Sequence, residues 1–378
     1  MSDELSKLFD EFDRGRISRR QLFKALGIVV VATPAIALAK GQGGGQSGRA
    51  PLDTTPAKLP FERTGWKTVK LDYIACEVAD QAKEAAFYNT LMNWGVRSAG
   101  DKETVLAIGN WGHFIIRGGY QPAADVVAAE KERYDRFQSR VPADQRQPFK
   151  PTEIKVTSFS WGIEPWNAKT VEAELTKRGL TPVAEHHGAF ESFRVKDPDG
   201  FDLQISNGRW APRSEATRAS LKASAPFAAT NWKTVWLDHI SFGVPDYKNS
   251  VAFYEALLGW KPGKDIGNQN QCQIGEIGDI IIRTMGRPGA AAPKGANVDH
   301  ISWGISPFDP DTVKAELEKR QLRARPDSGT GGVDIHKSVF QSYHTTTPSG
   351  FDLQISNVGK ANREASAEAT VSRPGGGE

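Results

Sequence analysis

The strongest constraint on the fold of this chain is an internal repeat that covers most of its length. Five segments of the first half return in the same order in the second half, and such ordered matches are the signature of a duplicated structural unit. They are 66–74 and 232–240 (WKTVKLDYI, WKTVWLDHI), 86–91 and 252–257 (AFYNTL, AFYEAL), 160–163 and 302–305 (SWGI), 170–175 and 312–317 (TVEAEL, TVKAEL), and 200–207 and 350–357 (GFDLQISN). The two halves are therefore predicted to share one fold.

Each half divides again into two units of the same kind. In the second half, alternating residues predict a strand over 235–244, and apolar residues at helical spacing predict a helix over 250–258. Asp246 is a suitable N-cap for this helix, and Gly259 follows its end. The remaining expected elements are strands 271–277 and 280–284 around a turn at Gly278 and Asp279, a strand 298–305, a helix 309–319, and strands 339–345 and 351–356. The pattern predicts an α+β fold of four βαβββ modules.

Composition agrees with two soluble domains of ordinary size. The chain has 378 residues, and its formal charge of +3 gives no electrostatic case for binding nucleic acid. Cys76 and Cys272 are its two cysteines, too few for a disulfide scaffold or a thiolate zinc site, although the sequence leaves open whether they pair. We predict an N-terminal domain over 66–210, a linker over 211–230, a C-terminal domain over 231–358 and a disordered tail over 359–378. Residues 120–152 are predicted to be a charged, helical insertion that the second half lacks.

The first 39 residues have the pattern of an export signal. Residues 18–24 (SRRQLFK) carry positive charge, 25–37 are mostly apolar, and 37–39 (ALA) suit signal cleavage. The pair Arg19-Arg20 resembles the twin-arginine type, which is read by a translocase for folded proteins. We therefore expect contact with the twin-arginine export machinery, a flexible linker over 40–65, and a mature protein that is periplasmic or otherwise exported and has no membrane segment.

The repeated segments resemble the vicinal oxygen chelate superfamily, which holds glyoxalases, bleomycin-resistance proteins and extradiol ring-cleaving dioxygenases. The resemblance covers nearly all of 66–357 and is most specific at 197–200 (DPDG) and 348–350 (PSG), ahead of the last strand of each half. It implies that paired βαβββ modules form two cupped, mixed-sheet barrels. A four-module chain of this kind is most similar to the two-domain extradiol dioxygenases.

The resemblance also implies where a metal ion is held. Its ligands come from the first strand of each paired module and from the last strand of the second module, which in the C-terminal half gives His239, His300 and Gln354. Two histidines in the same local phrase, DHIS, are themselves a strong signal, because the pairing of modules brings such strands together. Imidazole and amide oxygen suit Fe(II), which we favour, and also Mn(II), Zn(II) or Ni(II). Dioxygenases of this type carry Glu at the position of Gln354, so the expected site lacks a charged ligand.

The first half is not expected to bind a metal. Tyr73 stands at the position of His239, and Ser158 at the position of His300. Counted from the preceding glycine, Ile116 and Ile282 occupy the position of Gln354 in modules 1 and 3. The resemblance therefore implies that the fourth ligand of glyoxalase-type sites is missing, which leaves coordination positions open, as catalysis requires.

Two further histidines are candidates for proton transfer. The extradiol signature places a substrate-side histidine at His336 and a tyrosine at the position of His344, which lies ten residues before Gln354. A histidine at that position could act as a base toward a substrate hydroxyl or as an acid toward an oxyanion. The alternative is that both are ordinary solvent-facing residues.

Three functions remain open from the sequence. The first is a metal-dependent enzyme that cleaves a catechol-type small molecule as the extradiol dioxygenases do. The second is a glyoxalase-like lyase or isomerase, which the neutral Gln354 favours. The third is an exported small-molecule binding protein without catalysis, similar to the bleomycin-resistance branch.

Overall fold

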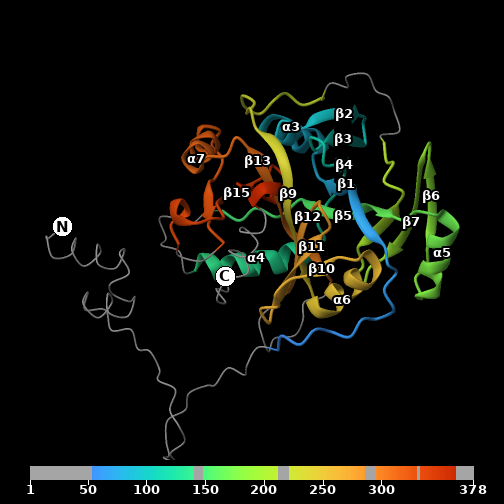
Figure 1. Ribbon diagram of the computed structural model, residues 1–378. Helices are drawn as coiled ribbons and strands as arrows, with labels where there is room; N and C mark the ends of the chain where they lie inside the picture. The colour runs from blue at the N-terminus through green and yellow to red at the C-terminus, as the bar shows by residue number, and fades with distance from the viewer. Residues whose placement is uncertain (1–52, 140–147, 212–220, 286–294, 330–332, 363–378) are drawn as a thin grey trace, which may run out of the picture. The chain divides into compact units, whose positions relative to one another are not determined.

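The computed structural model describes residues 53–139, 148–211, 221–285, 295–329 and 333–362 (Figure 1). The predicted signal peptide 1–39, and parts of both predicted linkers and of the predicted tail, lie outside the described residues. Contacts group the chain into two units, and all described elements lie in the second, which spans Leu52–Glu378.

The first half forms one eight-stranded sheet with the order β2-β3-β4-β1-β5-β8-β7-β6. β1 pairs in parallel with β4 and antiparallel with β5, so the two modules join along their first strands. The elements are β1 (Lys67–Val78), α3 (Gln81–Leu91), β2 (Gly95–Ala99), β3 (Glu103–Ala107), β4 (His113–Gly118), α4 (Ala124–Gln138), β5 (Ile154–Glu164), α5 (Ala168–Lys177), β6 (Val183–His187), β7 (Phe190–Lys196) and β8 (Asp202–Ser206).

The second half repeats this sheet with the order β10-β11-β12-β9-β13-β16-β15-β14. The elements are β9 (Lys233–Val244), α6 (Tyr247–Leu258), β10 (Lys261–Pro262), β11 (Gln269–Ile274), β12 (Gly278–Thr284), β13 (Asn297–Ser306), α7 (Pro310–Lys319), β14 (Arg325–Asp327), β15 (Ser342–Thr346) and β16 (Asp352–Ser356), with short 3-10 helices η2 (Ile335–Lys337) and η3 (Lys360–Asn362). The predicted α+β fold of four βαβββ modules in two mixed sheets is confirmed.

Local signals placed most elements correctly. Asp246 caps α6 by accepting hydrogen bonds from the Lys248 and Asn249 amides, and Gly259 ends it in the left-handed region at φ 67°. The expected turn at Gly278 and Asp279 is wrong by a few residues. Both residues belong to β12, and the turn precedes them at residues 275–277.

The two halves pack through the helix-bearing faces of their sheets, and the contacts obey the internal symmetry. Trp94, which follows α3, contacts Trp303 of β13 with ring centroids 5.5 Å apart, and its indole N–H donates to Thr234 at 2.8 Å. In the symmetry-related position Trp260, which follows α6, contacts Trp161 at 5.6 Å and donates to Thr68 at 3.0 Å. Module 1 thus packs on module 4, and module 3 on module 2. All four of these tryptophans are buried in the core.

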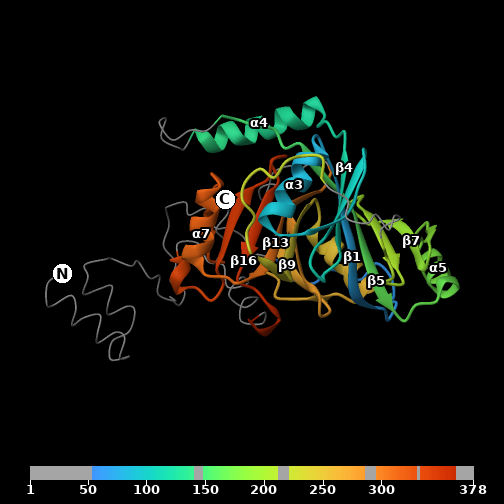
Figure 2. The same ribbon diagram turned by 90° about the horizontal axis from the view of Figure 1, so that it is seen from above.

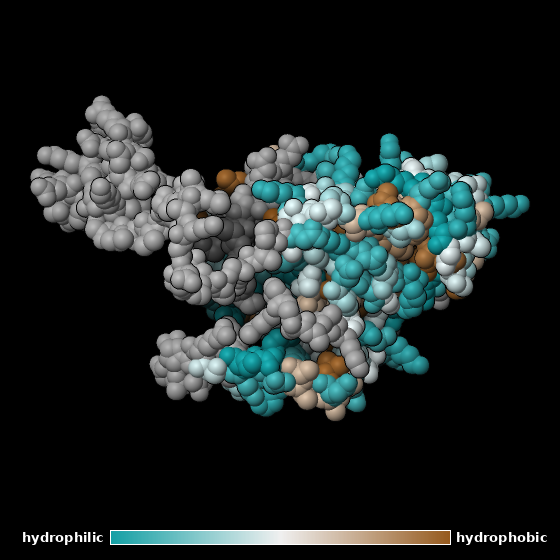
Figure 3. Space-filling view, turned by 90° about the horizontal axis from the view of Figure 1, so that it is seen from below, coloured by the Kyte–Doolittle hydropathy of each residue, from teal (hydrophilic) through white to brown (hydrophobic). Residues whose placement is uncertain are grey.

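The segments outside the modules run over their surface. Residues 53–65 lie against α6, where Phe61 packs edge-on against Phe253. The helix predicted within 120–152 is α4, which lies outside both sheets (Figure 2). The face drawn in Figure 3 is mostly hydrophilic, with small hydrophobic areas between hydrophilic residues. Within the described residues, no helix is both long and apolar enough to span a membrane.

A buried carboxyl group of the first half supports the turn before β16. Glu84 of α3 is 0% exposed and accepts a hydrogen bond from the Ser349 amide at 3.0 Å. Burial raises the pKa of this carboxyl, against the effect of its hydrogen bonds with Thr347 and Ser349. In the symmetry-related contact the serine lies on the helix and the acid lies in the turn. Ser250 of α6 donates to Asp199, in the turn before β8, at 2.5 Å.

We expect Glu84→Ala to lower the free energy of unfolding by about 2–3 kcal/mol, because it leaves the buried Ser349 amide without an acceptor and opens a small cavity. Denaturation by urea measures this loss. The control is Lys83→Ala on the exposed face of the same helix, which should change stability by less than about 0.5 kcal/mol. Equal effects of the two substitutions would contradict the assigned role of Glu84.

Candidate metal centre

The predicted ligands lie on one face of the C-terminal sheet. Ile240 of β9, Ile301 of β13 and Leu353 of β16 belong to the helix-covered core, so His239, His300 and Gln354 face the other way. Pairing across the strands places His239 opposite Ser302, Ser302 opposite Gln354, and Gln354 opposite His344. We call this side of the sheet the polar face.

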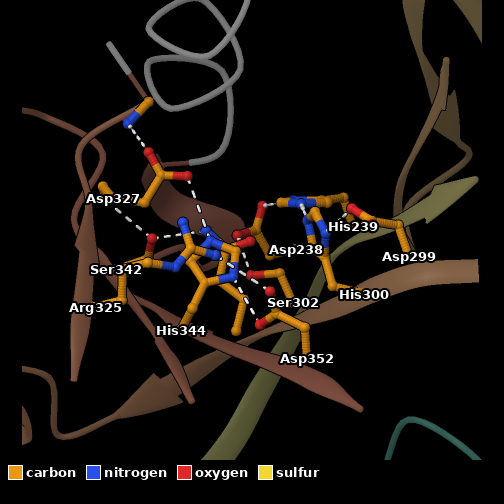
Figure 4. A network of polar contacts seen from close by, with 12 residues as sticks. Asp238, His239, Asp299, His300, Ser302, Arg325, Asp327, Ser342, His344 and Asp352 are labelled. Atoms are coloured by element: carbon orange, nitrogen blue, oxygen red, sulfur yellow. Dashed lines mark hydrogen bonds and ion pairs between the residues drawn. The ribbon is translucent and has the colours of Figure 1, made fainter. Parts of the chain in front are cut away.

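The two histidines meet at their Nε2 atoms, which are 2.9 Å apart (Figure 4). His239 is 3% exposed and His300 is 6% exposed, so this contact is shielded from water. Two nitrogens that bind one metal ion at right angles, each about 2.1 Å away from it, are about 3 Å apart. The spacing of the imidazoles therefore fits two ligands of one ion.

The other ring nitrogen of each histidine faces a carboxylate. His300 Nδ1 lies 2.8 Å from Asp299 Oδ2, and His239 Nδ1 lies 3.2 Å from Asp238 Oδ1. If both Nδ1 atoms donate to these carboxylates, both Nε2 atoms present lone pairs to each other. Burial lowers the pKa of His300 to about 4, so this ring is neutral near pH 7 and able to bind a metal.

Gln354 presents an unused acceptor at the same face. Its side-chain amide donates to Ser342 Oγ at 2.7 Å, while its buried Oε1 has no hydrogen-bond partner among the described residues. Gln204, its counterpart in the first half, is satisfied there, because the Tyr73 hydroxyl donates to its Oε1. The two amide nitrogens pair alike, since Gln204 donates to Ser192 as Gln354 donates to Ser342, so the two side chains differ at Oε1. A buried amide oxygen without a donor is costly, and a cation would satisfy it.

The position of a fourth ligand is apolar, but the residue differs from the expected one. Ile282 belongs to the helix-covered core, whereas Ile281 pairs with Ser241 as Gln354 pairs with Ser302. The count from glycine is wrong by one residue because Gly278 begins a strand, whereas Gly350 lies in a turn. In the first half, likewise, the residue at this position is Ile115, opposite Ala75, and not Ile116. Apart from this shift, the position carries no donor, as predicted.

The described residues contain no group of three or more His, Cys, Asp or Glu side chains arranged to hold a metal ion. The candidate centre consists instead of two imidazoles and one amide oxygen. Their chemistry fits a divalent ion of the first transition row, and the set carries no charge of its own.

His344 lies beside the histidine pair, and its ring centroid is 5.2 Å from that of His300 (Figure 4). Its Nδ1 lies 2.8 Å from Asp352 Oδ1, and its Nε2 lies 3.4 Å from Asp327 Oδ2. Burial acts to lower the pKa of His344, but the bonds to Asp327 and Asp352 outweigh it and raise the pKa. His344 is thus stabilised as a cation, which suits an acid better than a base.

The structure does not bring His336 to this group. Its side chain is 48% exposed on η2, and its Nε2 lies 3.6 Å from Asp311 Oδ1 in the first turn of α7. A catalytic role for His336 remains a prediction that these contacts do not favour.

The corresponding face of the first half is filled by side chains. Tyr73, Ala75, Val105 and Ile115 form a small apolar cluster, and Trp210 packs against it. Trp210 lies 5.4 Å from the ring of Tyr73. The first half therefore has the same scaffold, with aromatic packing in place of the histidines.

Comparison with known proteins finds a family match for part of the chain and solved structures of similar fold. Residues 236–353 match the sequence profile of the Glyoxalase/Bleomycin resistance protein/Dioxygenase superfamily. The match covers the C-terminal half, and the N-terminal half has the same strand order, so that the two sheets hold four βαβββ modules. No curated protein matches the chain.

Solved structures of similar fold include an extradiol ring-cleaving dioxygenase from B. fuscum (15% identity, 82% of this chain and 75% of that one, TM-score 0.50). They also include the Mn(II)-bound glyoxalase from Novosphingobium aromaticivorans (14%, 77% and 82%, TM-score 0.49) and homoprotocatechuate 2,3-dioxygenase from Arthrobacter globiformis (15%, 81% and 82%, TM-score 0.48). At these identities the likeness concerns the fold alone.

Sequence reasoning missed the carboxylates around the histidines. Asp238 and Asp299 directly precede His239 and His300, and Asp352 begins the strand that carries Gln354. The signal was present in the repeated Asp-His pair. Its meaning depends on strand irregularities that a sequence pattern does not reveal.

The raised pKa of His344 predicts a pH-dependent contribution to stability. A group whose pKa is higher in the folded state stabilises the fold fully below its unfolded pKa, about 6.5 for histidine. This contribution is lost as the pH rises through the higher folded pKa. We therefore expect the loss of unfolding free energy caused by His344→Gln, in metal-free protein, to be larger at pH 6 than at pH 9.

Urea denaturation across this range measures the difference, and His336→Gln on the half-exposed η2 serves as the control. A loss for His344→Gln that stays constant from pH 6 to pH 9 would contradict the assigned ion pairs with Asp327 and Asp352.

Proposed function

We propose that the C-terminal half binds one divalent metal ion through Nε2 of His239, Nε2 of His300 and Oε1 of Gln354, and that the protein is a metal-dependent enzyme. The observation that carries this proposal is the 2.9 Å approach of the two buried Nε2 atoms, each on a ring whose other nitrogen faces a carboxylate. If both Nδ1 atoms donate to these carboxylates, the two Nε2 lone pairs face each other, and a cation bound by both nitrogens would remove that repulsion. The unsatisfied Oε1 of Gln354 supplies the third donor.

The substrate class that we propose combines the donor set with the resemblance to the vicinal oxygen chelate superfamily. Three protein ligands and an apolar residue, Ile281, at the fourth position leave room for a small molecule that offers two adjacent oxygens. A bound divalent ion supplies Lewis acidity, which lowers the pKa of hydroxyl groups held next to it. We favour Fe(II), with Mn(II), Zn(II) or Ni(II) as alternatives.

The residues around the ligands bind, orient and hold protons. His344 keeps a proton between Asp352 and Asp327, and its longer contact, 3.4 Å from Nε2 to Asp327, is the one that a substrate oxygen could replace. An imidazolium there would donate to an oxyanion. Ser342 orients the amide of Gln354, and Ser302 lies between Gln354 and His239 in the strand pairing.

Within this class we propose extradiol ring cleavage of a catechol-type substrate. Two histidines on the first strands of paired modules, and a third ligand on the last strand, support it. A glyoxalase-like lyase or isomerase is the second candidate, and the neutral amide of Gln354 favours it. Export through the twin-arginine machinery is also part of the proposal and is supported by residues 18–39 alone.

We expect purified protein to contain about one equivalent of a divalent transition metal, and the double variant His239→Ala, His300→Ala to contain almost none. Elemental analysis of both proteins measures this. The matched control is His186→Ala, His187→Ala, which removes two adjacent histidines of β6 from the first half and should leave the metal content unchanged. Equal metal content in all three proteins would contradict the site.

We expect protein loaded anaerobically with Fe(II) to consume oxygen with at least one member of a catechol panel and to form a coloured ring-fission product. The rate should fall at least 100-fold in the double variant, because the substrate then has no ion to chelate. An oxygen electrode and absorbance measure the reaction. Metal-loaded protein that consumes no oxygen but isomerises a keto-aldehyde adduct would favour the second candidate. Tight ligand binding that is unaffected by a chelator would argue against both enzymes.

A further inference from the structure

Both aspartates behind the histidines occupy the same kind of irregular position. In the pairing of β9 with β13, His239 lies opposite Ser302 and Leu237 opposite Trp303, so Asp238 is an extra residue without a partner. On the other strand, Val298 lies opposite Phe242 and His300 opposite Ser241, so Asp299 is the extra residue. Such β-bulges redirect side chains that a regular strand would send to the opposite face.

Both bulges recur in the first half, but only one of the two aspartates recurs there. In the first half, Asp72 and Thr157 are the extra residues of the β1–β5 pairing. Asp72 accepts hydrogen bonds from Ser160 and Ser206, and Asp238 likewise accepts one from Ser302 at 2.7 Å. Thr157, at the position of Asp299, donates to the Ala75 carbonyl at 3.2 Å. A carboxylate at the second bulge is therefore specific to the half that carries the histidines.

We propose that Asp238 and Asp299 are positioning residues of the metal centre, which hold the Nδ1 protons of His239 and His300 so that both Nε2 lone pairs converge on one point. This inference rests on the proposed function. It adds how two imidazoles and an uncharged amide are oriented so that they can bind one metal ion. The contacts that carry it are those of Nδ1 to carboxylate, 2.8 Å at Asp299 and 3.2 Å at Asp238.

Charge supports the same inference. Two imidazoles and an amide bring no negative charge to a divalent ion. Asp238 and Asp299 each place a carboxylate beside the ring nitrogen that faces away from the proposed ion. Their negative charges thus offset the positive charge of the ion, although neither carboxylate binds it directly. Carboxylates in this relation to a ligand histidine fix its tautomer and raise its basicity.

Asp299 is the better residue for a test. Its side chain is 52% exposed, and the other charged group near it is Arg283, at 3.9 Å. Substitution there should leave the fold intact. Asp238 is buried and also accepts a hydrogen bond from Ser302. Its substitution would therefore change the stability of the fold as well as the orientation of His239. Asp72→Asn in the first half measures the structural part of that effect, because Asp72 has the matching serine contacts without a histidine.

The experiment measures Zn(II) affinity by competition with a chromophoric chelator, together with the imidazole 15N spectra of metal-free and Zn(II)-loaded full-length protein. We expect Asp299→Ala to weaken Zn(II) binding about 10–100-fold. Asp299→Asn, which can still accept from Nδ1 but has no charge, should weaken it less. Asp72→Asn should leave it unchanged. In the wild-type protein both histidines should carry a proton on Nδ1, and Asp299→Ala should shift His300 toward the other tautomer.

The outcomes separate the two proposals. If the wild-type protein binds Zn(II) and Asp299→Ala binds it equally well, the role of the aspartates is overturned and the metal site stands. The same conclusion follows if His300 of the wild-type protein lacks an Nδ1 proton. A wild-type protein with both Nδ1 protons in place that binds no Zn(II) overturns the proposed function, while the orientation of the rings by the aspartates stands.

Discussion

Two imidazole nitrogens lie 2.9 Å apart inside a folded sheet, and the rest of the site is arranged around that contact. Both rings are buried, which shields their contact from bulk water. Carboxylates occupy the opposite ring nitrogens, which fixes how the rings are turned. An unsatisfied amide oxygen lies two strands away from His239 in the same row. A cation bound at this centre, as we propose, would account for all of these features together.

The duplicated chain provides its own comparison. The two halves share strand order, bulges, serine contacts and the GFDLQISN strand, so these features reflect the scaffold. They differ where the first half has Tyr73, which donates to Gln204, and a packed Trp210. The first half also supports the second, because Glu84 accepts a hydrogen bond in the turn before the strand that carries Gln354. One half thus carries the candidate site, while the other contributes packing.

Much of this arrangement could be predicted from the sequence. The ordered repeats gave the four modules, helix periodicity and caps gave α6 and α7, and the DHIS phrases identified His239 and His300. The strand irregularities could not be predicted, because a bulge depends on the pairing of two strands rather than on either strand alone. For this reason Asp238 and Asp299 went unassigned, and the fourth position was placed at Ile282 instead of Ile281. His336 matched a signature in sequence, but its surroundings on η2 direct it to Asp311.

Anomalous diffraction from crystals grown with Mn(II) or Fe(II), recorded at the absorption edge of the metal, tests the central claim most directly. The account predicts one strong peak in the C-terminal half, within bonding distance of Nε2 of His239, Nε2 of His300 and Oε1 of Gln354, and none at Tyr73 and Gln204. A metal-loaded crystal whose peak lies away from this histidine pair, or in which the amide of Gln354 turns from the ion, would contradict it.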